Sequence, residues 1–109
     1  MNIPIVVKND FPSLILELQD NDYSVVFCDC DENNEKCVNW IKVIKKMRPK
    51  VPLIVISKKI DKSIGGKLYQ LGIFHLCEKP LNKDYLKEIL SAILTPSKSY
   101  DKFNNFNNI

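Results

Sequence analysis

Continuous apolar runs and regularly spaced apolar positions alternate along the chain. The continuous runs occupy residues 3–7 (IPIVV), 23–28 (YSVVFC), 51–57 (VPLIVIS) and 74–77 (FHLC). Such runs are typical of strands that are covered on both faces, as in a parallel sheet. Pro4 restricts the first run to the start of a strand or to a sheet edge, because proline has no N–H to donate.

Between these runs, apolar residues recur every three or four positions, which is the spacing of one helix face. The predicted helices run from the Asn9–Asp10 cap region through Gln19, over 37–47, over 62–71 and over 82–94. Asp61 and Asn82 are candidate N-caps of the last two. Four strand–helix pairs in succession predict an α/β fold with a mainly parallel sheet.

The length of 109 residues predicts one domain, which we place at residues 1–95. Residues 96–109 are polar and rich in Asn, so we expect a disordered tail. The net charge of +3 is too small for a nucleic-acid surface. No apolar run is long enough for a membrane span and no signal-peptide pattern opens the chain, so we expect a cytoplasmic protein without membrane or nucleic-acid partners.

Chemistry collects at the carboxyl ends of strands in a parallel sheet. Asp10, Asp29, Ser57 and Lys79 fall at these ends. Asp29 is a candidate nucleophile, Ser57 a candidate hydrogen-bond donor to a phosphoryl oxygen, and Lys79 a candidate counter-charge. The set suits formation of an aspartyl phosphate.

These segments resemble the receiver domain of two-component response regulators. YSVVFCD matches the strand that ends in the phosphoacceptor, VPLIVIS the strand that ends in Ser or Thr, and LGIFHLCEKP the segment that ends in Lys-Pro. The resemblance implies a flavodoxin-like (CheY-like) open parallel sheet with four βα units. It implies that Asp29 is the phosphoacceptor, that Ser57 and Lys79 contact the phosphoryl group, and that the Lys79–Pro80 peptide can be cis.

The chain departs from the receiver pattern at three places. The family's first strand and helix, with the acidic pair that holds Mg²⁺, have no counterpart, so Mg²⁺ would rely on Asp29, the backbone near Asp31 and Asp10. Lys58 follows Ser57 where receivers carry a small residue. Leu76 replaces the aromatic residue that reports phosphorylation.

The resemblance predicts a signalling module rather than an enzyme. Its partners would be a histidine kinase or phosphotransfer protein and an output protein. The alternative is a degenerate pseudo-receiver, an interaction or dimerisation module that works without phosphorylation.

The missing unit also affects the predicted sheet. With right-handed crossovers, three helices cover one face and only the 82–94 helix covers the other. Exposed apolar area of that kind usually marks an interface. We therefore expect a homodimer, a swapped element or a partner that completes the fold.

The four cysteines can be interpreted in three ways. In the expected compartment, reduced thiols are favoured over a disulfide. A zinc site would combine the thiols of Cys28, Cys30, Cys37 and Cys77 with His75, but their spacing does not suit zinc.

Overall fold

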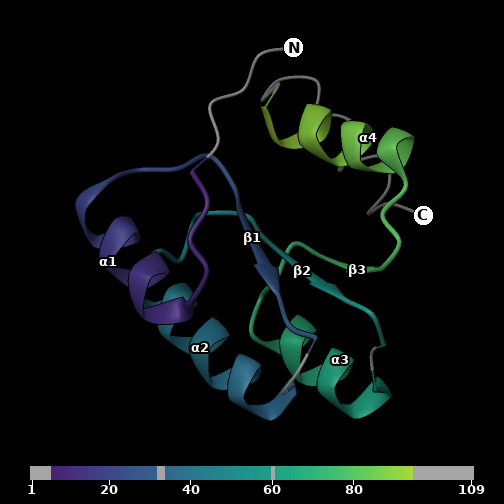
Figure 1. The fold of residues 1–109 in the computed structure, drawn as a ribbon, viewed down its shortest axis with the longest axis horizontal. Helices are drawn as coiled ribbons and strands as arrows, with labels where there is room; N and C mark the ends of the chain where they lie inside the picture. The colour runs from purple at the N-terminus through teal and green to yellow at the C-terminus, as the bar shows by residue number, and fades with distance from the viewer. Residues whose placement is uncertain (1–5, 32–33, 60, 95–109) are drawn as a thin grey trace.

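The computed structural model describes residues 6–31, 34–59 and 61–94. Helices and strands alternate along them in the order α1 (Phe11–Asp20), β1 (Val26–Asp29), α2 (Asn34–Met47), β2 (Leu53–Ser57), α3 (Lys62–Gln70), β3 (His75–Glu78) and α4 (Lys83–Leu94) (Figure 1). The strands form one parallel sheet in the order β1-β2-β3. The predicted α/β class and parallel sheet are confirmed.

The predicted first strand is not present where the structure describes the chain. Residues 3–5 lie outside the described residues, and Val6 and Val7 belong to no strand. Their exposed fractions are 52% and 75%, so no neighbouring element covers them. The apolar pattern alone could not show whether a hydrogen-bonding neighbour exists. β1 is consequently an edge strand of the described sheet. The predicted disordered tail at 96–109 also lies outside the described residues.

Side-chain caps start three of the helices. The carboxylate of Asp10 accepts a hydrogen bond from the Ser13 amide (2.7 Å), and that of Asp61 accepts one from the Ser63 amide (3.2 Å). The Asn82 side chain accepts from two amides of the first turn of α4. Each cap satisfies an amide that has no partner inside its helix. Within the described ranges, no helix is long and apolar enough to cross a membrane.

Helix α3 ends in a Schellman motif at Gly72. Gly72 has a φ of 91°, a conformation that glycine adopts without steric cost. The Gly72 amide donates to the Tyr69 carbonyl (3.0 Å), and the Ile73 amide donates to the Leu68 carbonyl (3.4 Å). Ile73 and Leu68 are both buried in the same core cluster, which is the apolar contact that accompanies this motif. The turn directs the chain into β3.

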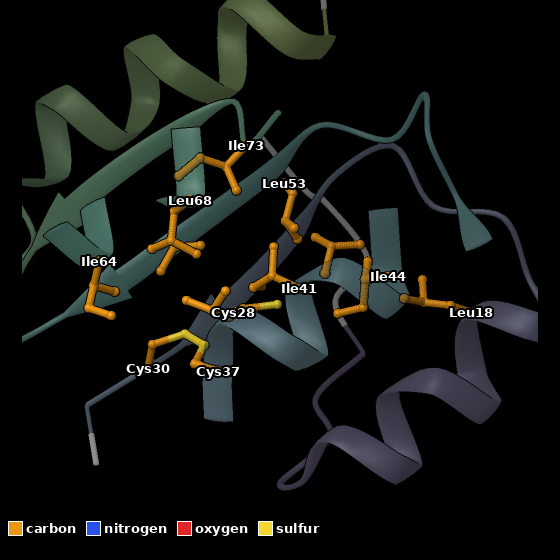
Figure 2. Packing of buried hydrophobic residues seen from close by; sticks show 13 residues of the cluster. Leu18, Cys28, Cys30, Cys37, Ile41, Ile44, Leu53, Ile64, Leu68 and Ile73 are labelled. Carbon is orange, nitrogen blue, oxygen red and sulfur yellow. A yellow bond between two sulfur atoms is a disulfide. The ribbon is translucent and has the colours of Figure 1, made fainter. Parts of the chain in front are cut away.

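The main core lies between the sheet and helices α1, α2 and α3 (Figures 1 and 2). Its buried members include Leu18, Val26, Cys28, Ile41, Ile44, Leu53, Val55, Ile64 and Leu68. Burial of these apolar side chains is the chief favourable term in folding, at roughly 25 cal/mol per Å² removed from water. The helix stripes read from the sequence therefore face the sheet as predicted.

Among the described residues, α4 is the only helix on the opposite face of the sheet (Figure 1). Ile54, Cys77 and Ile89 form a small buried cluster there. Val25 and Phe27 pack against it but remain half-buried, as does Ile56. This confirms the predicted division of helices, three on one face and one on the other.

Arg48 joins the end of α2 to the end of α1. Its guanidinium donates two hydrogen bonds to the Leu18 carbonyl (2.9 and 2.5 Å) and lies 3.2 Å from the Asp22 carboxylate. A cationic side chain at a helix C-terminus satisfies carbonyls that lack intrahelical partners. Arg48 thus holds the ends of α1 and α2 together.

Candidate functional site

The carboxyl ends of the three strands bring the predicted residues to one edge of the sheet. Asp29 ends β1, Ser57 ends β2, and Lys79 follows β3. The Lys79 amide donates to the Ser57 carbonyl (2.9 Å), which extends the pairing of β3 with β2 beyond the last strand residue. The Lys79–Pro80 peptide is cis. Parallel pairing thereby places Lys79 beside Asp29, 50 residues earlier in the chain.

Lys79 binds two carboxylates at once. Its Nζ lies 2.6 Å from Asp29 Oδ2 and 2.6 Å from Asp31 Oδ2. The Asp31 carboxylate also accepts a hydrogen bond from the Lys58 amide (2.6 Å), and the Asp31 amide donates to Asp29 Oδ1 (3.2 Å). The sequence led us to expect only a backbone contribution from Asp31. The contacts of its carboxylate with Lys79 and the Lys58 amide were not predicted. A carboxylate two residues beyond the candidate phosphoacceptor was the available signal.

Exposure separates the two carboxylates. The Asp29 side chain is 57% exposed, whereas that of Asp31 is 18% exposed and that of Lys79 30%. Asp29 is therefore the more solvent-accessible of the two carboxylates. Asp31 is the one held more firmly within the site.

Hydrogen bonds in the site favour the charged forms of Asp31 and Lys79. The ammonium of Lys79, followed by the Lys58 amide, lowers the pKa of Asp31 below its usual value. Hydrogen bonds to Asp29 and Asp31 raise the pKa of Lys79. At neutral pH the Asp31 carboxylate is therefore ionised and the Lys79 amine protonated.

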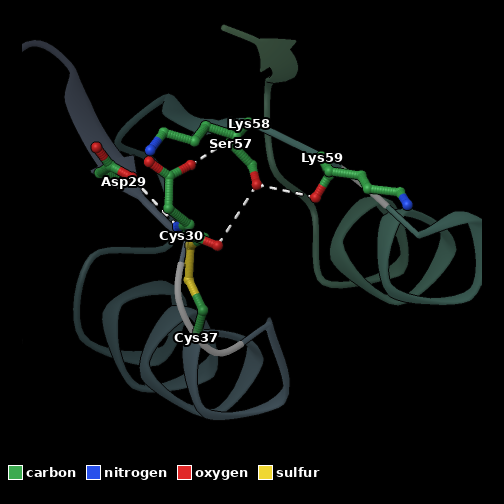
Figure 3. Close-up of a disulfide and its surroundings, with 7 residues drawn as sticks. Asp29, Cys30, Cys37, Ser57, Lys58 and Lys59 are labelled. Carbon is green, nitrogen blue, oxygen red and sulfur yellow. Dashed lines mark hydrogen bonds between the residues drawn. A yellow bond between two sulfur atoms is a disulfide. The ribbon is translucent and has the colours of Figure 1, made fainter.

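Ser57 is buried and its hydroxyl faces backbone carbonyls (Figure 3). Its Oγ lies 3.1 Å from the Lys59 carbonyl and 3.5 Å from the Cys30 carbonyl. One hydroxyl proton can serve only one acceptor at a time. The hydroxyl would have to leave these carbonyls to reach a group on Asp29, and its expected role stays a prediction.

Asp10 is used as a helix cap, so its carboxylate is engaged with α1 through Ser13. Among residues 6–31, 34–59 and 61–94, no group of three or more His, Cys, Asp or Glu side chains is arranged to hold a metal. Asp29 and Asp31 remain as a pair of hard oxygen ligands, but Lys79 lies between them where a cation would bind. A divalent ion fits this pair only if the ammonium moves aside.

The expectation that all four cysteines are reduced thiols is wrong for two of them. Cys30 and Cys37 form a disulfide, with Cα atoms 5.8 Å apart, because α2 starts just beyond the end of β1 and packs over it (Figures 2 and 3). Cys28 and Cys77 are free and buried. The zinc alternative gains no support, since two of its thiols are bonded to each other and His75 is paired with the Tyr85 hydroxyl.

The other two departures from the receiver pattern have different surroundings. Lys58 is exposed, and its charge helps to lower the pKa of Asp31 after the larger effects of hydrogen bonding. Leu76 is half-buried and packs against the main core. Leu76 therefore contributes to the packing between β3 and the helices, and it does not lie on the surface as an aromatic residue that reports phosphorylation would.

The fold that these residues build is that of response-regulator receiver domains, without the first strand–helix unit in the described part of the chain. By structure, the chain is similar to NtrX from Brucella abortus in complex with ADP, with a TM-score of 0.67 at 23% identity. It is also similar to a response regulator protein from Burkholderia pseudomallei with a phosphorylated aspartic acid, a calcium ion and citrate, with a TM-score of 0.62 at 14% identity.

These similarities cover 89% and 90% of this chain, but 22% of NtrX and 56% of the Burkholderia pseudomallei protein. By sequence, no protein-family model and no curated protein matches the chain. The likeness therefore establishes the fold, and the chain corresponds to only part of each of these larger proteins.

Proposed function

We propose that this chain is a receiver module of two-component signal transduction, in which Asp29 accepts a phosphoryl group from a histidine kinase or phosphotransfer protein. The observation that carries the proposal is the contact of the Lys79 ammonium with the Asp29 carboxylate at the end of β1. At the end of β1 a carboxylate is accessible to a phosphodonor, and its negative charge is balanced by the ammonium of Lys79.

The proposed reaction is a displacement at phosphorus. An Asp29 carboxylate oxygen attacks the phosphorus of a phosphohistidine, the P–N bond breaks, and the leaving imidazole takes up a proton. The product is an acyl phosphate on Asp29. The Lys79 ammonium stabilises the negative charge on the phosphoryl oxygens, and the Ser57 hydroxyl donates to one of them after turning from the backbone carbonyls.

Asp29 and Asp31 are the residues that would hold a divalent ion such as Mg²⁺. The ion would supply charge neutralisation during phosphoryl transfer. The phosphorylated Burkholderia pseudomallei neighbour contains calcium, which is compatible with a divalent ion in proteins of this fold. In this chain Asp31 serves mainly to fix Lys79 and the Lys58 amide near Asp29.

Output would occur through protein contacts, without catalytic turnover of its own, in the cytoplasm. Within the described residues, one edge of β1 has no strand beside it, and the side chains of Val25, Phe27 and Ile56 are half-buried. Both features favour a second copy or another polypeptide that completes the sheet. Sedimentation velocity tests this partner proposal: a concentration-dependent dimer is expected, and a compact monomer at all concentrations would remove the dimer.

A phosphorylation-independent interaction module is the second candidate. It is favoured by the double engagement of Lys79 and by the orientation of the Ser57 hydroxyl toward carbonyls. In this alternative the Asp29–Lys79–Asp31 group is a structural link between β1 and the end of β3. In both candidates the partner would bind at the edge of β1 and at the half-buried side chains of Val25, Phe27 and Ile56.

A small phosphodonor separates the two functions. The intact chain is incubated with the donor and Mg²⁺, and its mass is compared before and after mild base, which cleaves acyl phosphates. Addition of one base-labile HPO₃ group is expected in the wild type and in Asp20→Asn, an exposed control on α1, but not in Asp29→Asn. If no adduct forms under conditions that label an ordinary receiver, the phosphorylation proposal is rejected and the interaction module is favoured.

A further inference from the structure

The Cys30–Cys37 disulfide lies directly beside the candidate phosphoacceptor site (Figure 3). Cys30 is the residue between Asp29 and Asp31, so the two carboxylates that bind Lys79 flank the bonded cysteine. Cys37 belongs to α2. The bond therefore ties the carboxylate segment to a helix of the main core.

Hydrogen bonds connect this disulfide to the remaining site residues. The Cys30 amide donates to the Ile56 carbonyl (2.8 Å), and the Ser57 hydroxyl lies 3.5 Å from the Cys30 carbonyl. Both contacts fix the Cys30 backbone against β2. The sulfur bond therefore adds a covalent link between α2 and the end of β1 to the packing that they share in the main core.

Asp31 lies inside the ring that the disulfide closes, since the two cysteines are seven positions apart. The partners of its carboxylate, the Lys58 amide and the Lys79 ammonium, lie outside that ring. Opening the ring removes a covalent restraint from Asp31 while leaving these partners in place. The position of Asp31 is thus the part of the site most sensitive to the bond.

The other two thiols are poorly suited to compete for this exchange. Burial raises the pKa of the Cys28 thiol to about 12, and it also raises the pKa of Cys77. A thiol that remains protonated is a weak nucleophile, because the thiolate is the attacking species. Cys30 and Cys37 are themselves buried, at 5% and 4% exposed, so exchange at this pair requires local opening of the structure around it.

We propose that Cys30 and Cys37 are a reversible redox modification site, whose disulfide holds the Asp31 carboxylate in place beside Asp29 and whose reduction releases it. The reactant is a dithiol, either a small molecule or a dithiol protein. One of its thiolates attacks a sulfur of the pair, the S–S bond breaks and a mixed disulfide forms. Its second thiol then displaces the protein sulfur, so that the dithiol is oxidised to a disulfide and both cysteines become thiols.

One expectation, the compartment, and one observation, the position of the bond, favour a reversible rather than a permanent bond. Disulfides in a cytoplasm of ordinary redox poise are mostly catalytic or redox-sensing, and the chain is expected to work in that compartment. The bond also adjoins the carboxylates that form the candidate site instead of stapling distant parts of the chain. The inference does not require phosphorylation of Asp29, so its tests and those of the proposed function can fail separately.

Reversibility is tested on the full folded chain in buffers that contain defined ratios of reduced to oxidised dithiothreitol. Free thiols are trapped by alkylation and located by peptide mapping, and circular dichroism monitors the fold. Cys30 and Cys37 are expected to become alkylated together as the ratio rises, while the helical signal remains. A pair that resists reduction until denaturant is added would overturn the proposal, as would a pair that stays reduced in every buffer.

Coupling to the site is tested by hydrogen exchange of the Lys58 amide, whose acceptor is Asp31 Oδ1. Reduction of the wild type is expected to accelerate this exchange about tenfold or more, as a local opening would. Cys37→Ser is expected to show the fast rate in both oxidising and reducing buffer, and Cys77→Ser, which leaves the pair intact, to respond like the wild type. Equal Lys58 exchange in the oxidised and reduced wild type would overturn the coupling, even if Cys37→Ser fails to fold.

Discussion

The Nζ atom of Lys79 lies 2.6 Å from a carboxylate oxygen of Asp29 and 2.6 Å from one of Asp31. These carboxylates come from the end of β1, whereas Lys79 follows β3, and β2 separates the two strands in the sheet. A single cation therefore connects the two outer strands of the described sheet. Charge balance at the proposed phosphorylation site depends on this connection.

Replacement of Lys79 by Met is expected to raise the pKa of Asp31, because its largest stabilising hydrogen bond is lost. Carbon-detected NMR titration of the Asp31 carboxyl measures this change. Lys83→Met, an exposed change in α4, is the matched control and should leave the Asp31 titration unchanged. An unaltered Asp31 pKa in Lys79→Met would show that the ion pair does not persist in solution.

The stability of the chain should depend on pH through Asp31. Its folded pKa is lowered, so its contribution is fully present above the usual Asp pKa of about 3.9 and is lost as pH falls below that value toward the folded pKa. Urea unfolding at a series of pH values is expected to show a shallower acid decline in Asp31→Asn than in Asp20→Asn. Parallel declines in the two variants would contradict the assigned pairing.

Lys79 should have the opposite effect at high pH. Its folded pKa is raised, so its contribution is complete below the usual Lys value of about 10.4 and is lost as pH rises through the folded pKa. The free energy of unfolding of the wild type should therefore fall in strong base more steeply than that of Lys79→Met. The same urea series, extended to high pH, measures both curves.

Reduction of the Cys30–Cys37 bond is expected to lower the free energy of unfolding by about 2 to 3 kcal/mol, the chain-entropy value for a ring of this size. For a domain of this length the change corresponds to a fall in Tm of roughly 10 to 20 °C. Thermal unfolding with and without reductant provides the measurement. Cys77→Ser should show the same difference between the two conditions, whereas Cys37→Ser should show none.

Asp10 is expected to matter for stability and not for the site. Asp10→Ala removes the N-cap of α1 and should cost about 1 kcal/mol. The Asp10→Ala variant should bind Mg²⁺ with the affinity of the wild type when measured by calorimetry, whereas the Asp29→Asn variant should bind it more weakly. A loss of Mg²⁺ affinity in Asp10→Ala at unchanged fold would restore Asp10 as a ligand.

Much of the fold could be predicted from local sequence because its signals are local. The caps at Asp10, Asp61 and Asn82 and the glycine turn at Gly72 each depend on residues a few positions away. The strand prediction for 3–7 was wrong at Val6 and Val7 because a strand also needs a neighbour to pair with. Apolar composition does not contain that information.

The candidate site could be predicted only in outline. Strand ends place Asp29 and Lys79 at one edge of a parallel sheet, which the alternation of strands and helices implies. The side-chain role of Asp31 and the Cys30–Cys37 bond depend on where the chain between β1 and α2 brings its ends. That geometry has no periodic signal, and the expected compartment argued for free thiols.

The most direct test of phosphorylation at this site is whether the phosphoryl group is carried by Asp29 or by Asp31. After treatment with a small phosphodonor and Mg²⁺, the labelled chain is reduced with borohydride, which converts an acyl phosphate to the alcohol, and the modified residue is located by tandem mass spectrometry. Conversion is expected at the exposed Asp29 in the wild type, and none is expected in Asp29→Asn. Conversion at Asp31, or an adduct that persists in Asp29→Asn, would contradict this expectation.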